Sequence, residues 1–419
     1  MIRGTAFSKS GASGTIADML ELEDALQRIL TALPAPVNER VALHEAAGRI
    51  LAEDIASSID LPPFDNSAMD GYAVRAEDVE RATREIPICL RLRGKAAAGE
   101  IFAGEISRGQ CVRLFTGSPL PRGADAVVMQ EDTRVDPGQP DEVFVLDAAK
   151  PWENVRLRGG DVNKGSVLAR AGEVLTAGNI SLLAASGITG IVTGKVPRVG
   201  VLATGSELRE AGQILAPGQI CESNRAALAV LIRRTGGVPQ SFPLVPDNLP
   251  ATCRALEAAF GENDAVVTSG GVSVGELDFV KAAFEQLGGE LQFWKVAIRP
   301  GKPFVFGRCR GKFLFGLPGN PVSAFVTFLL LVRPALLRWQ GAAEVALPAY
   351  PGVLAEPLAN PGERRHYMRV RVDRAGRVFS AGLQASHALR SLAAANGLVD
   401  VSPQTFLAPG MTVPVMRWD

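Results

Sequence analysis

The chain has 419 residues, of which 47% are hydrophobic and 21% are charged, so it is large enough to form several buried cores. Lysine plus arginine equal aspartate plus glutamate at 44 each, and no overall charge therefore attracts the protein to nucleic acid or to an acidic membrane. These values exclude a strongly charged nucleic-acid or membrane-surface protein. They predict a globular protein of about two to four domains that holds any anionic partner at a local site.

Cysteine usage and hydropathy both favour the cytoplasm. The five cysteines are odd in number and never form a Cys-x-x-Cys pair, which is typical of a reducing compartment and argues against a thiolate zinc site. The longest apolar run, residues 324–332, is about half as long as a membrane span. The N-terminus carries no basic and apolar leader, so we expect a cytoplasmic protein without a membrane segment.

The first half of the chain predicts one domain interrupted by another. After a polar, glycine-rich tail, apolar residues at helical spacing predict an amphipathic helix. These residues are Met19, Leu22, Ala25, Leu26 and Ile29. Short β-branched runs separated by Gly and Pro between residues 86 and 146 predict a small all-β module. A helix returns over residues 176–188, with Thr176 as its N-cap and Gly187 at its end.

From residue 196, predicted strands alternate with helices of ten or more residues, which indicates an α/β domain with a mostly parallel sheet covered on both faces. After about residue 341 the chain becomes β-like and is punctuated by Pro and Gly. We therefore predict a flexible tail (1–15), a linker domain (16–60 and 155–195), an inserted β domain (61–154), an α/β domain (196–340) and a C-terminal β domain (341–419).

Three glycine-rich loops follow predicted strands of the α/β domain, at residues 203–208, 268–278 and 316–323. In an open α/β sheet ligands bind beyond the carboxyl ends of the strands, where backbone N–H groups and helix dipoles favour anions. Each loop alone is accounted for by tight-turn chemistry, but three at corresponding positions predict a shared anion site. Gly275 is followed by Glu276 instead of the lysine of a phosphate-binding loop, so an ordinary nucleoside triphosphate is not expected.

Positive charge for such a site is expected from the segment "FWKVAIRPGKP", residues 293–303. It offers Lys295, Arg299 and Lys302 in and after a predicted strand, and two prolines stiffen its turn. The alternative is that these are three solvated charges at a strand end. Their closeness in sequence to the glycine-rich loops favours the anion site.

Carboxylates in the loops at the strand ends are candidates for binding Mg²⁺ against phosphate oxygens, since hard oxygen ligands suit that ion. For each of them the alternative is a helix N-cap or first-turn acid, and Glu207 and Asp278 are the preferred metal ligands. The four carboxylates are Glu207, Asp247, Glu276 and Asp278. The histidines are too scattered for a zinc triad, and they are His44, His366 and His387.

A second polar stretch, "LPPFDNSAMDGYAVR", covers residues 61–75 and is longer than one Asx-turn needs. It contains Asp70, and two later stretches, "LFTGSPLPRGADAVV" and "RLRGGDVNKG", add Thr116 and Asp161. These stretches bring small polar groups and cations without a protein nucleophile.

These stretches together resemble the molybdopterin molybdenumtransferase family of molybdenum cofactor biosynthesis, to which the E domain of gephyrin is similar. The resemblance covers about residues 17–419. It rests on "PFDNSAMDGYA", "TGSPLPRGADAVVMQED", "RGGDVNKG", "TSGGVSVGELD" and "LPGNPVS", in the family's order. It implies four domains: an elongated linker domain, an inserted β domain, a molybdopterin-binding α/β domain and a C-terminal β domain. It also implies a homodimer whose shared active cleft joins the α/β domain of one subunit to the inserted region of the other.

The activity that the resemblance implies is insertion of molybdate into adenylylated molybdopterin, with release of AMP and a requirement for Mg²⁺. The pyrophosphate of the adenylylated molybdopterin is then the anion that the glycine-rich loop receives. Molybdate itself exchanges ligands, so the protein has to supply position and charge neutralisation instead of a nucleophile. Molybdopterin adenylyltransferase and downstream cofactor-handling proteins are the partners that this activity implies.

The resemblance also carries over site residues, motif by motif. The catalytic candidates are Asp70, Thr116, Asp161, Glu207, Asp247 and Asp278. The substrate-binding candidates are Ser206, Gly270, Gly271, Ser273, Gly275, Lys295, Arg299, Lys302, Pro318, Gly319, Asn320 and Pro321. Among these, Glu207 and Asp278 are expected to bind the metal.

Two positions depart from the family pattern. Arg299 stands where the family often has lysine, which replaces a point charge by a planar fork. Glu222 stands where aspartate is common. The exact oxyanion contacts therefore stay open, as does the preference for molybdate or tungstate.

Two alternative functions also stay open. Molybdopterin adenylyltransferases share the α/β domain, but the resemblance implies that they carry a Gly-Gly-Thr-Gly loop, whereas residues 270–273 read Gly-Gly-Val-Ser. They also lack the first two domains. The other alternative is a non-catalytic dimeric scaffold of the gephyrin type, against which the acidic and cationic loop residues argue.

Overall fold

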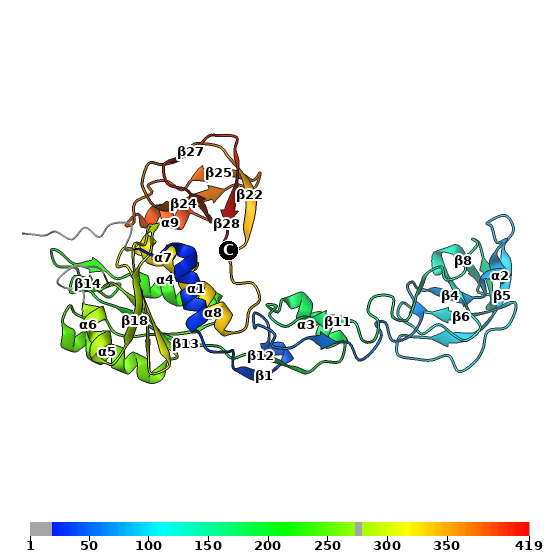
Figure 1. Cartoon of the computed structure of the whole chain (residues 1–419). Helices are drawn as coiled ribbons and strands as arrows, with labels where there is room; N and C mark the ends of the chain where they lie inside the picture. The colour runs from blue at the N-terminus through cyan, green and yellow to red at the C-terminus, as the bar shows by residue number, and fades with distance from the viewer. Residues whose placement is uncertain (1–18, 273–278, 419) are drawn as a thin grey trace, which may run out of the picture.

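The computed structural model describes residues 19–272 and 279–418 and shows an elongated molecule with a large lobe at each end (Figure 1). One end holds the α/β domain with the C-terminal β domain packed beside it, and the other end holds the inserted β domain. The chain passes along the thin linker between them twice, because the inserted domain interrupts the linker.

A six-stranded sheet, in the order β16-β13-β17-β21-β20-β18, forms the centre of the α/β domain. The first four strands are parallel, and β20 and β18 run antiparallel to their neighbours. The strands are β13 (Arg198–Ala203), β16 (Val238–Ser241), β17 (Ala265–Ser269), β18 (Glu290–Lys295), β20 (Pro303–Cys309) and β21 (Lys312–Leu317). The prediction of an α/β domain with a mostly parallel sheet is confirmed.

Helices cover both faces of this sheet, as the alternation of strands and helices predicts. Val199 and Val201 point to a core shared with α1, α4, α7 and α8, whereas Leu202 and Val266 point to a core shared with α5 and α6. The helices are α1 (Leu22–Ala32), α4 (Asn224–Arg234), α5 (Leu249–Glu262), α6 (Phe279–Gln286), α7 (Pro321–Thr327), a π-helical segment (Phe328–Val332) and α8 (Arg333–Trp339).

The amphipathic helix predicted near the N-terminus is α1, which begins at Leu22 and buries Leu22, Ala25 and Ile29. These three side chains belong to the core of the α/β domain, where α1 packs against α8. The predicted linker domain begins at residue 16, before this helix. We describe α1 with the α/β domain, because that is the domain its apolar face contacts.

The helical stretch 321–339 is long and apolar enough by composition to cross a membrane, with a mean hydropathy of 1.5. However, 78% of it is buried inside the protein. Its residues Phe328, Leu331 and Val332 pack against the sheet as part of the main core. The stretch therefore has the environment of a core helix.

The linker consists of three short antiparallel pairs between the outgoing and the returning chain. The pairs are β1 (Asn38–Ala42) with β12 (Gly190–Gly194), β2 (Ile55–Ala56) with β11 (Val167–Ala169), and β3 (Asn66–Ser67) with β10 (Val155–Arg156). Helix α3 (Ala177–Ala185) lies on the returning chain and is capped by Thr176 in a capping box with Asn179, as predicted. Gly187 follows the helix with a φ of +81°, a conformation that favours glycine.

The inserted domain is a six-stranded sheet in the order β7-β4-β6-β5-β9-β8. Alternate residues such as Val74, Leu90 and Val143 form its core. The strands are β4 (Gly71–Val74), β5 (Ile88–Ala96), β6 (Gln110–Leu114), β7 (Ala126–Met129), β8 (Thr133–Asp136) and β9 (Gln139–Val145), and the short helix α2 (Ala76–Val79) follows β4. The predicted all-β module is confirmed.

The C-terminal domain is a sheet that closes on itself, because β26 pairs with both β28 and β24. Its strands are β22 (Ala349–Leu354), β24 (Arg365–Val372), β25 (Arg377–Ser380), β26 (Gly397–Val401) and β28 (Thr412–Met416), with β23 (Leu358–Asn360) paired to β27 (Thr405–Leu407) and helix α9 (Leu389–Ala394). The short strand β19 (Ile298–Arg299) of the α/β domain pairs in parallel with β24 and so joins the two domains.

Candidate functional site

The strand order places a crevice next to β13. The chain goes from β13 to β16 on one side and then returns to β17 on the other side, so the order reverses between β13 and β17. Loops that leave neighbouring parallel strands on opposite sides of a sheet open a crevice at such a switch point, and ligands bind there in open α/β folds. The three predicted glycine-rich loops follow β13, β17 and β21, which are neighbours in the sheet.

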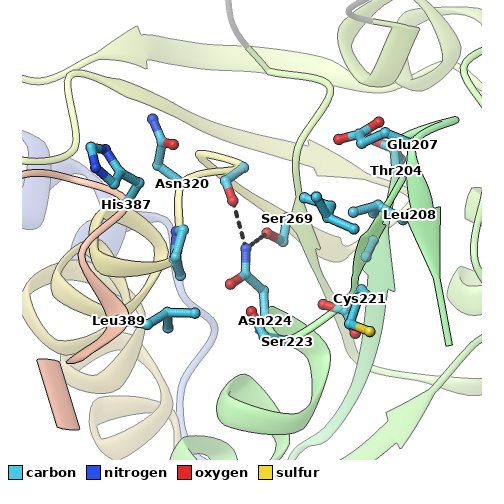
Figure 2. A pocket seen from close by; sticks show the side chains of 15 residues that line it. Thr204, Glu207, Leu208, Cys221, Ser223, Asn224, Ser269, Asn320, His387 and Leu389 are labelled. Atoms are coloured by element: carbon cyan, nitrogen blue, oxygen red, sulfur yellow. Dashed lines mark hydrogen bonds between the residues drawn. The ribbon is translucent and has the colours of Figure 1, made fainter. Parts of the chain in front are cut away.

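Two adjoining cavities, of about 580 Å³ and about 280 Å³, lie at this edge of the sheet. They share four lining residues, namely Thr204, Glu207, Gly319 and Asn320. Figure 2 shows the larger cavity, with Glu207 and Leu208 on one side and Asn320 on the other. The combined space suits a ligand larger than a simple anion.

Gly270 and Gly271 line the smaller cavity and adopt φ angles of +90° and +68°, which side chains rarely adopt. A Cβ added to Gly270 would lie 2.6 Å from the carbonyl oxygen of Thr204, and one added to Gly271 would lie 2.6 Å from Val280 Cγ2. The Gly270 N–H donates to the Leu317 carbonyl, so this amide is not free for an anion. The glycines allow the loop to pack closely, and anion binding by the other N–H groups of the three loops stays a prediction.

Asp247 joins the loop after β16 to the loop after β13. Its Oδ2 accepts a hydrogen bond from the Ser206 N–H (2.8 Å), and its own N–H donates to Ser206 Oγ (3.0 Å). Glu207, the neighbour of Ser206, is exposed and lines both cavities, and the described residues provide no hydrogen bond or ion pair for its carboxylate. Asp247 therefore holds the loop, and Glu207 is the carboxylate available to a ligand.

The loop after β21 contributes to both cavities. Gly319 and Asn320 line both, Pro318 lines the smaller one and Pro321 the larger one. Pro321 is also the first residue of α7, where its fixed φ suits a helix start.

Asn224 is a residue that the sequence analysis missed. It is the first residue of α4, and its Nδ2 donates to Ser269 Oγ (2.7 Å) at the end of β17 and to the Gly319 carbonyl (2.7 Å) after β21 (Figure 2). One amide therefore connects three elements of the crevice. The only sequence signal is an asparagine at a predicted helix start, which is also the usual sign of a cap.

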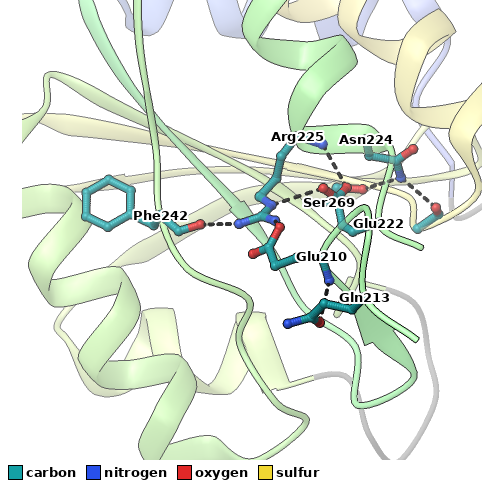
Figure 3. Close-up of polar contacts among 8 residues, drawn as sticks. Glu210, Gln213, Glu222, Asn224, Arg225, Phe242 and Ser269 are labelled. Carbon is teal, nitrogen blue, oxygen red and sulfur yellow. Dashed lines mark hydrogen bonds and ion pairs between the residues drawn. The ribbon is translucent and has the colours of Figure 1, made fainter. Parts of the chain in front are cut away.

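Glu222 serves a different partner from the oxyanion considered for it. It accepts hydrogen bonds from the backbone N–H (2.8 Å) and Nε (3.0 Å) of Arg225, which also binds Glu210 (2.6 Å) and the Phe242 carbonyl (Figure 3). Burial lowers the pKa of Arg225, but the bonds to Glu210 and Glu222 outweigh burial and raise it overall. Glu222 lines the larger cavity, but its carboxylate neutralises Arg225, a partner within the protein.

The three predicted cations are not among the residues that line the two cavities. Lys295 Nζ lies 3.9 Å from the ring centroid of Trp294, and Lys302 precedes Pro303, which lines the smaller cavity. Arg299 lies in β19 at the junction with the C-terminal domain. At this junction burial lowers the pKa of Arg364, and the positive charge of Arg299 lowers it further.

The polar group of the inserted domain lies at the other end of the molecule (Figure 1). Asp70 Oδ1 accepts hydrogen bonds from the backbone N–H and the hydroxyl of Thr116, both 2.8 Å long, and these bonds lower the pKa of Asp70. Asp161 lies on the neighbouring loop, where its N–H donates to the Leu61 carbonyl (3.0 Å). The structure brings Asp70 and Thr116 together, but within one chain it does not bring them to the crevice.

Four predicted site residues, Ser273, Gly275, Glu276 and Asp278, lie outside the described residues. Within residues 19–272 and 279–418, no three His, Cys, Asp or Glu side chains gather in a way that could hold a metal ion. Of the two preferred metal ligands, Glu207 alone lies within the described residues, and binding of Mg²⁺ stays a prediction.

The open sheet and the polar crevice at its switch point define the class: an α/β ligand-binding domain set between an inserted β domain and a C-terminal β domain. The chain matches the descriptions "MoeA N-terminal region (domain I and II)" over residues 20–187, "Probable molybdopterin binding domain" over 200–338 and "MoeA C-terminal region (domain IV)" over 351–418. The chain belongs to the MoeA family, the molybdopterin molybdenumtransferases.

Individual relatives agree with this membership. The chain is 40% identical over 384 residues to the molybdopterin molybdenumtransferase of Haemophilus influenzae, covering 90% of this chain and 93% of that protein. It is 38% identical over 385 residues to molybdopterin molybdenumtransferase 2 of Mycobacterium tuberculosis, covering 90% and 94%. A crystal structure of the molybdopterin biosynthesis moeA protein from Pyrococcus horikoshii superposes with a TM-score of 0.80 at 30% identity, covering 96% and 100%.

Proposed function

We propose that this chain inserts molybdate into adenylylated molybdopterin in the cytoplasm, with release of AMP and formation of molybdenum cofactor. The observation that carries the proposal is the convergence of three glycine-containing loops, after β13, β17 and β21, around the paired cavities at the switch point. The relatives named molybdopterin molybdenumtransferase support the choice of substrate and reaction.

Glu207 is the described residue that fits Mg²⁺. The ion usually takes one or two protein carboxylates together with substrate phosphates, and Glu207 offers an unpaired carboxylate where the two cavities meet. When bound there, Mg²⁺ neutralises phosphate charge. Asp247 supports this ligand through its two hydrogen bonds to the neighbouring Ser206.

Arg299, Arg364 and Lys302 are proposed to receive the molybdate oxyanion. The pKa of Arg364 is lowered by burial and by the like charge of Arg299, and its Nη1 donates to the Ile298 carbonyl (2.8 Å). No carboxylate pairs with Arg299 or Arg364 among the described residues. A doubly charged oxyanion would relieve their repulsion, and the planar forks of arginine suit its oxygens.

We further propose a homodimer with a shared cleft. Asp70 and Thr116 lie in the inserted domain, where the last strand pair of the linker, β3 with β10, joins it, and we call this junction the tip of the linker. The inserted domain and the α/β domain, which contains Glu207, lie at opposite ends of the molecule (Figure 1). A second subunit running the other way would place its Asp70 loop beside the crevice of the first. A two-fold symmetric dimer would then contain two equivalent sites.

The test is incubation of the purified protein with adenylylated molybdopterin, molybdate and Mg²⁺, with AMP measured by chromatography. We expect AMP release that depends on molybdate and falls when Mg²⁺ is chelated. Release of AMP at the rate of a blank without molybdate would contradict the proposal. A parallel reaction with ATP and molybdopterin distinguishes an adenylyltransferase, for which AMP transfer to molybdopterin would be the positive result.

A further inference from the structure

A segment of the C-terminal domain, residues 382–391, reaches the larger cavity of the α/β domain. It consists of a loop and the first turn of α9, and we call it the 382–391 loop. His387 and Leu389 of this 382–391 loop line the cavity together with Asn320 and Pro321. In Figure 2 they lie on the same side as Asn320, opposite Glu207 and Leu208. The cavity is therefore walled by two domains.

The 382–391 loop is attached to the wall of the crevice by the backbone. The Ser386 carbonyl accepts a hydrogen bond from the Val322 N–H (3.1 Å) in the first turn of α7. N–H groups in a first helical turn have no partner within their helix, so this contact satisfies one of them. It also places His387 directly beside the start of α7.

Arg369 holds the 382–391 loop from inside the C-terminal domain. It lies in β24 with 0% exposure, and its guanidinium donates to the carbonyls of Leu383 (2.6 Å) and Ala385 (3.2 Å) and to Ser391 Oγ (3.1 Å). Gln384 adds two bonds to the Arg369 backbone, of 3.0 Å and 2.8 Å. Burying a guanidinium is costly unless oxygens bind it, and the oxygens that bind Nε and Nη2 of Arg369 belong to the loop.

We infer that His387 contacts the substrate and that Arg369 is the positioning residue that holds His387 at the cavity. This inference rests on the proposed function. Leu389 and Leu208, on opposite sides in Figure 2, and Ile220 give the cavity apolar lining, which suits a flat nitrogen heteroaromatic ring. The imidazole of His387 then contacts the ring between these side chains.

Both adenine and the pterin have such a ring, so binding of AMP and of molybdopterin is measured separately. His387→Ala should raise the Kd of one of them, and the KM for adenylylated molybdopterin, at least about tenfold with kcat within about twofold, because binding is lost without loss of the reacting groups. The ligand whose Kd rises identifies the ring. Kd and KM values within about twofold of wild type would overturn the contact.

Positioning by Arg369 is tested through Ser391, because a substitution of the buried arginine is expected to unfold the domain. Ser391→Ala removes one partner of the guanidinium and should raise KM about threefold with unchanged kcat. In the His387→Ala background, Ser391→Ala should not raise KM further, since the effects of two residues that act through one another do not add. Full additivity would overturn the positioning role. Arg377→Ala, which removes an exposed ion pair with Asp373 in the same domain, is the control and should leave KM unchanged.

The two proposals fail separately. If wild type turns over and His387→Ala matches it, the 382–391 loop is outside the substrate site and the proposed function stands. If wild type releases no AMP, the proposed function fails. In that case the Kd values for molybdopterin and AMP still decide whether His387 contacts a heteroaromatic ligand.

Discussion

The crevice of the α/β domain and the tip of the linker both gather acidic side chains, but they hold them differently. In the crevice, Asn224 and Arg225 connect loops that come from distant parts of the chain, and Arg225 is largely buried between Glu210 and Glu222. At the tip, Asp70 binds Thr116 on an exposed surface. The crevice is thus a preformed cavity, whereas the tip is a polar surface suited to complete a site on another subunit.

The largest expected difference between the two regions is the stability lost when an ion pair is broken, in the crevice or at the tip. Arg225→Met leaves the Glu222 carboxylate, only 5% exposed, without its partner, and we expect a loss of about 3 kcal/mol, or about 6 °C or more in apparent Tm. Arg158→Ala at the tip removes an exposed pair with Asp60, and we expect a Tm within about 2 °C of wild type. Calorimetry measures both, and equal shifts would contradict the distinction between the two regions.

The proposed shared cleft predicts complementation between the two regions. Asp70→Ala and Glu207→Ala chains should each lose activity about 100-fold as homodimers, since each removes a charged group from every site. Mixing them at equal concentration should restore about one quarter of wild-type activity, because half of the dimers contain one intact site out of two. If labelled heterodimers form and AMP release stays at the parental level, the two regions do not share a site.

Glu207 and Asp247 differ in role within the crevice. Glu207→Gln should lower AMP release at least about tenfold, since losing a metal ligand removes more than about 1.4 kcal/mol of transition-state stabilisation. Its Tm should stay unchanged, because the exposed carboxylate has no partner among the described residues. Asp247→Asn keeps an oxygen for the Ser206 N–H and is the matched variant, with an expected loss under about threefold. Recovery of Glu207→Gln by excess Mg²⁺ would support the assignment, and a larger effect at Asp247 would reverse it.

The buried His366 of the C-terminal domain predicts that the stability of the fold depends on pH. Burial, and then the charges of Arg299, Arg369 and Arg364, lower the pKa of His366 to about 4 from 6.5. Below pH 6.5 the unfolded chain binds a proton that the folded chain does not take up until about pH 4, so stability falls as the pH falls through this window. Between pH 6.5 and 5.5 the loss is about 1 kcal/mol. His366→Phe should remove it, whereas replacing the exposed His44 by Gln should not.

Residue patterns alone predicted the local elements and their order. The alternation of predicted strands and helices after residue 196 indicated the α/β domain. The N-cap at Thr176 was predicted because threonine is a residue type that caps helices. Both depend on neighbours in sequence, which is why they could be predicted. The glycines at 270 and 271 marked a tight loop for the same reason.

Only the tertiary structure decided which side chains face a ligand. Asn224 and Glu222 look alike in sequence as polar residues at a helix start. In the structure the Asn224 amide connects three elements of the crevice, whereas the Glu222 carboxylate binds Arg225. His387 lies 180 residues after Glu207 in the numbering, and it reaches the same cavity because Arg369 and α7 hold its loop there. Contacts of this kind depend on how domains pack, and no local pattern encodes the packing.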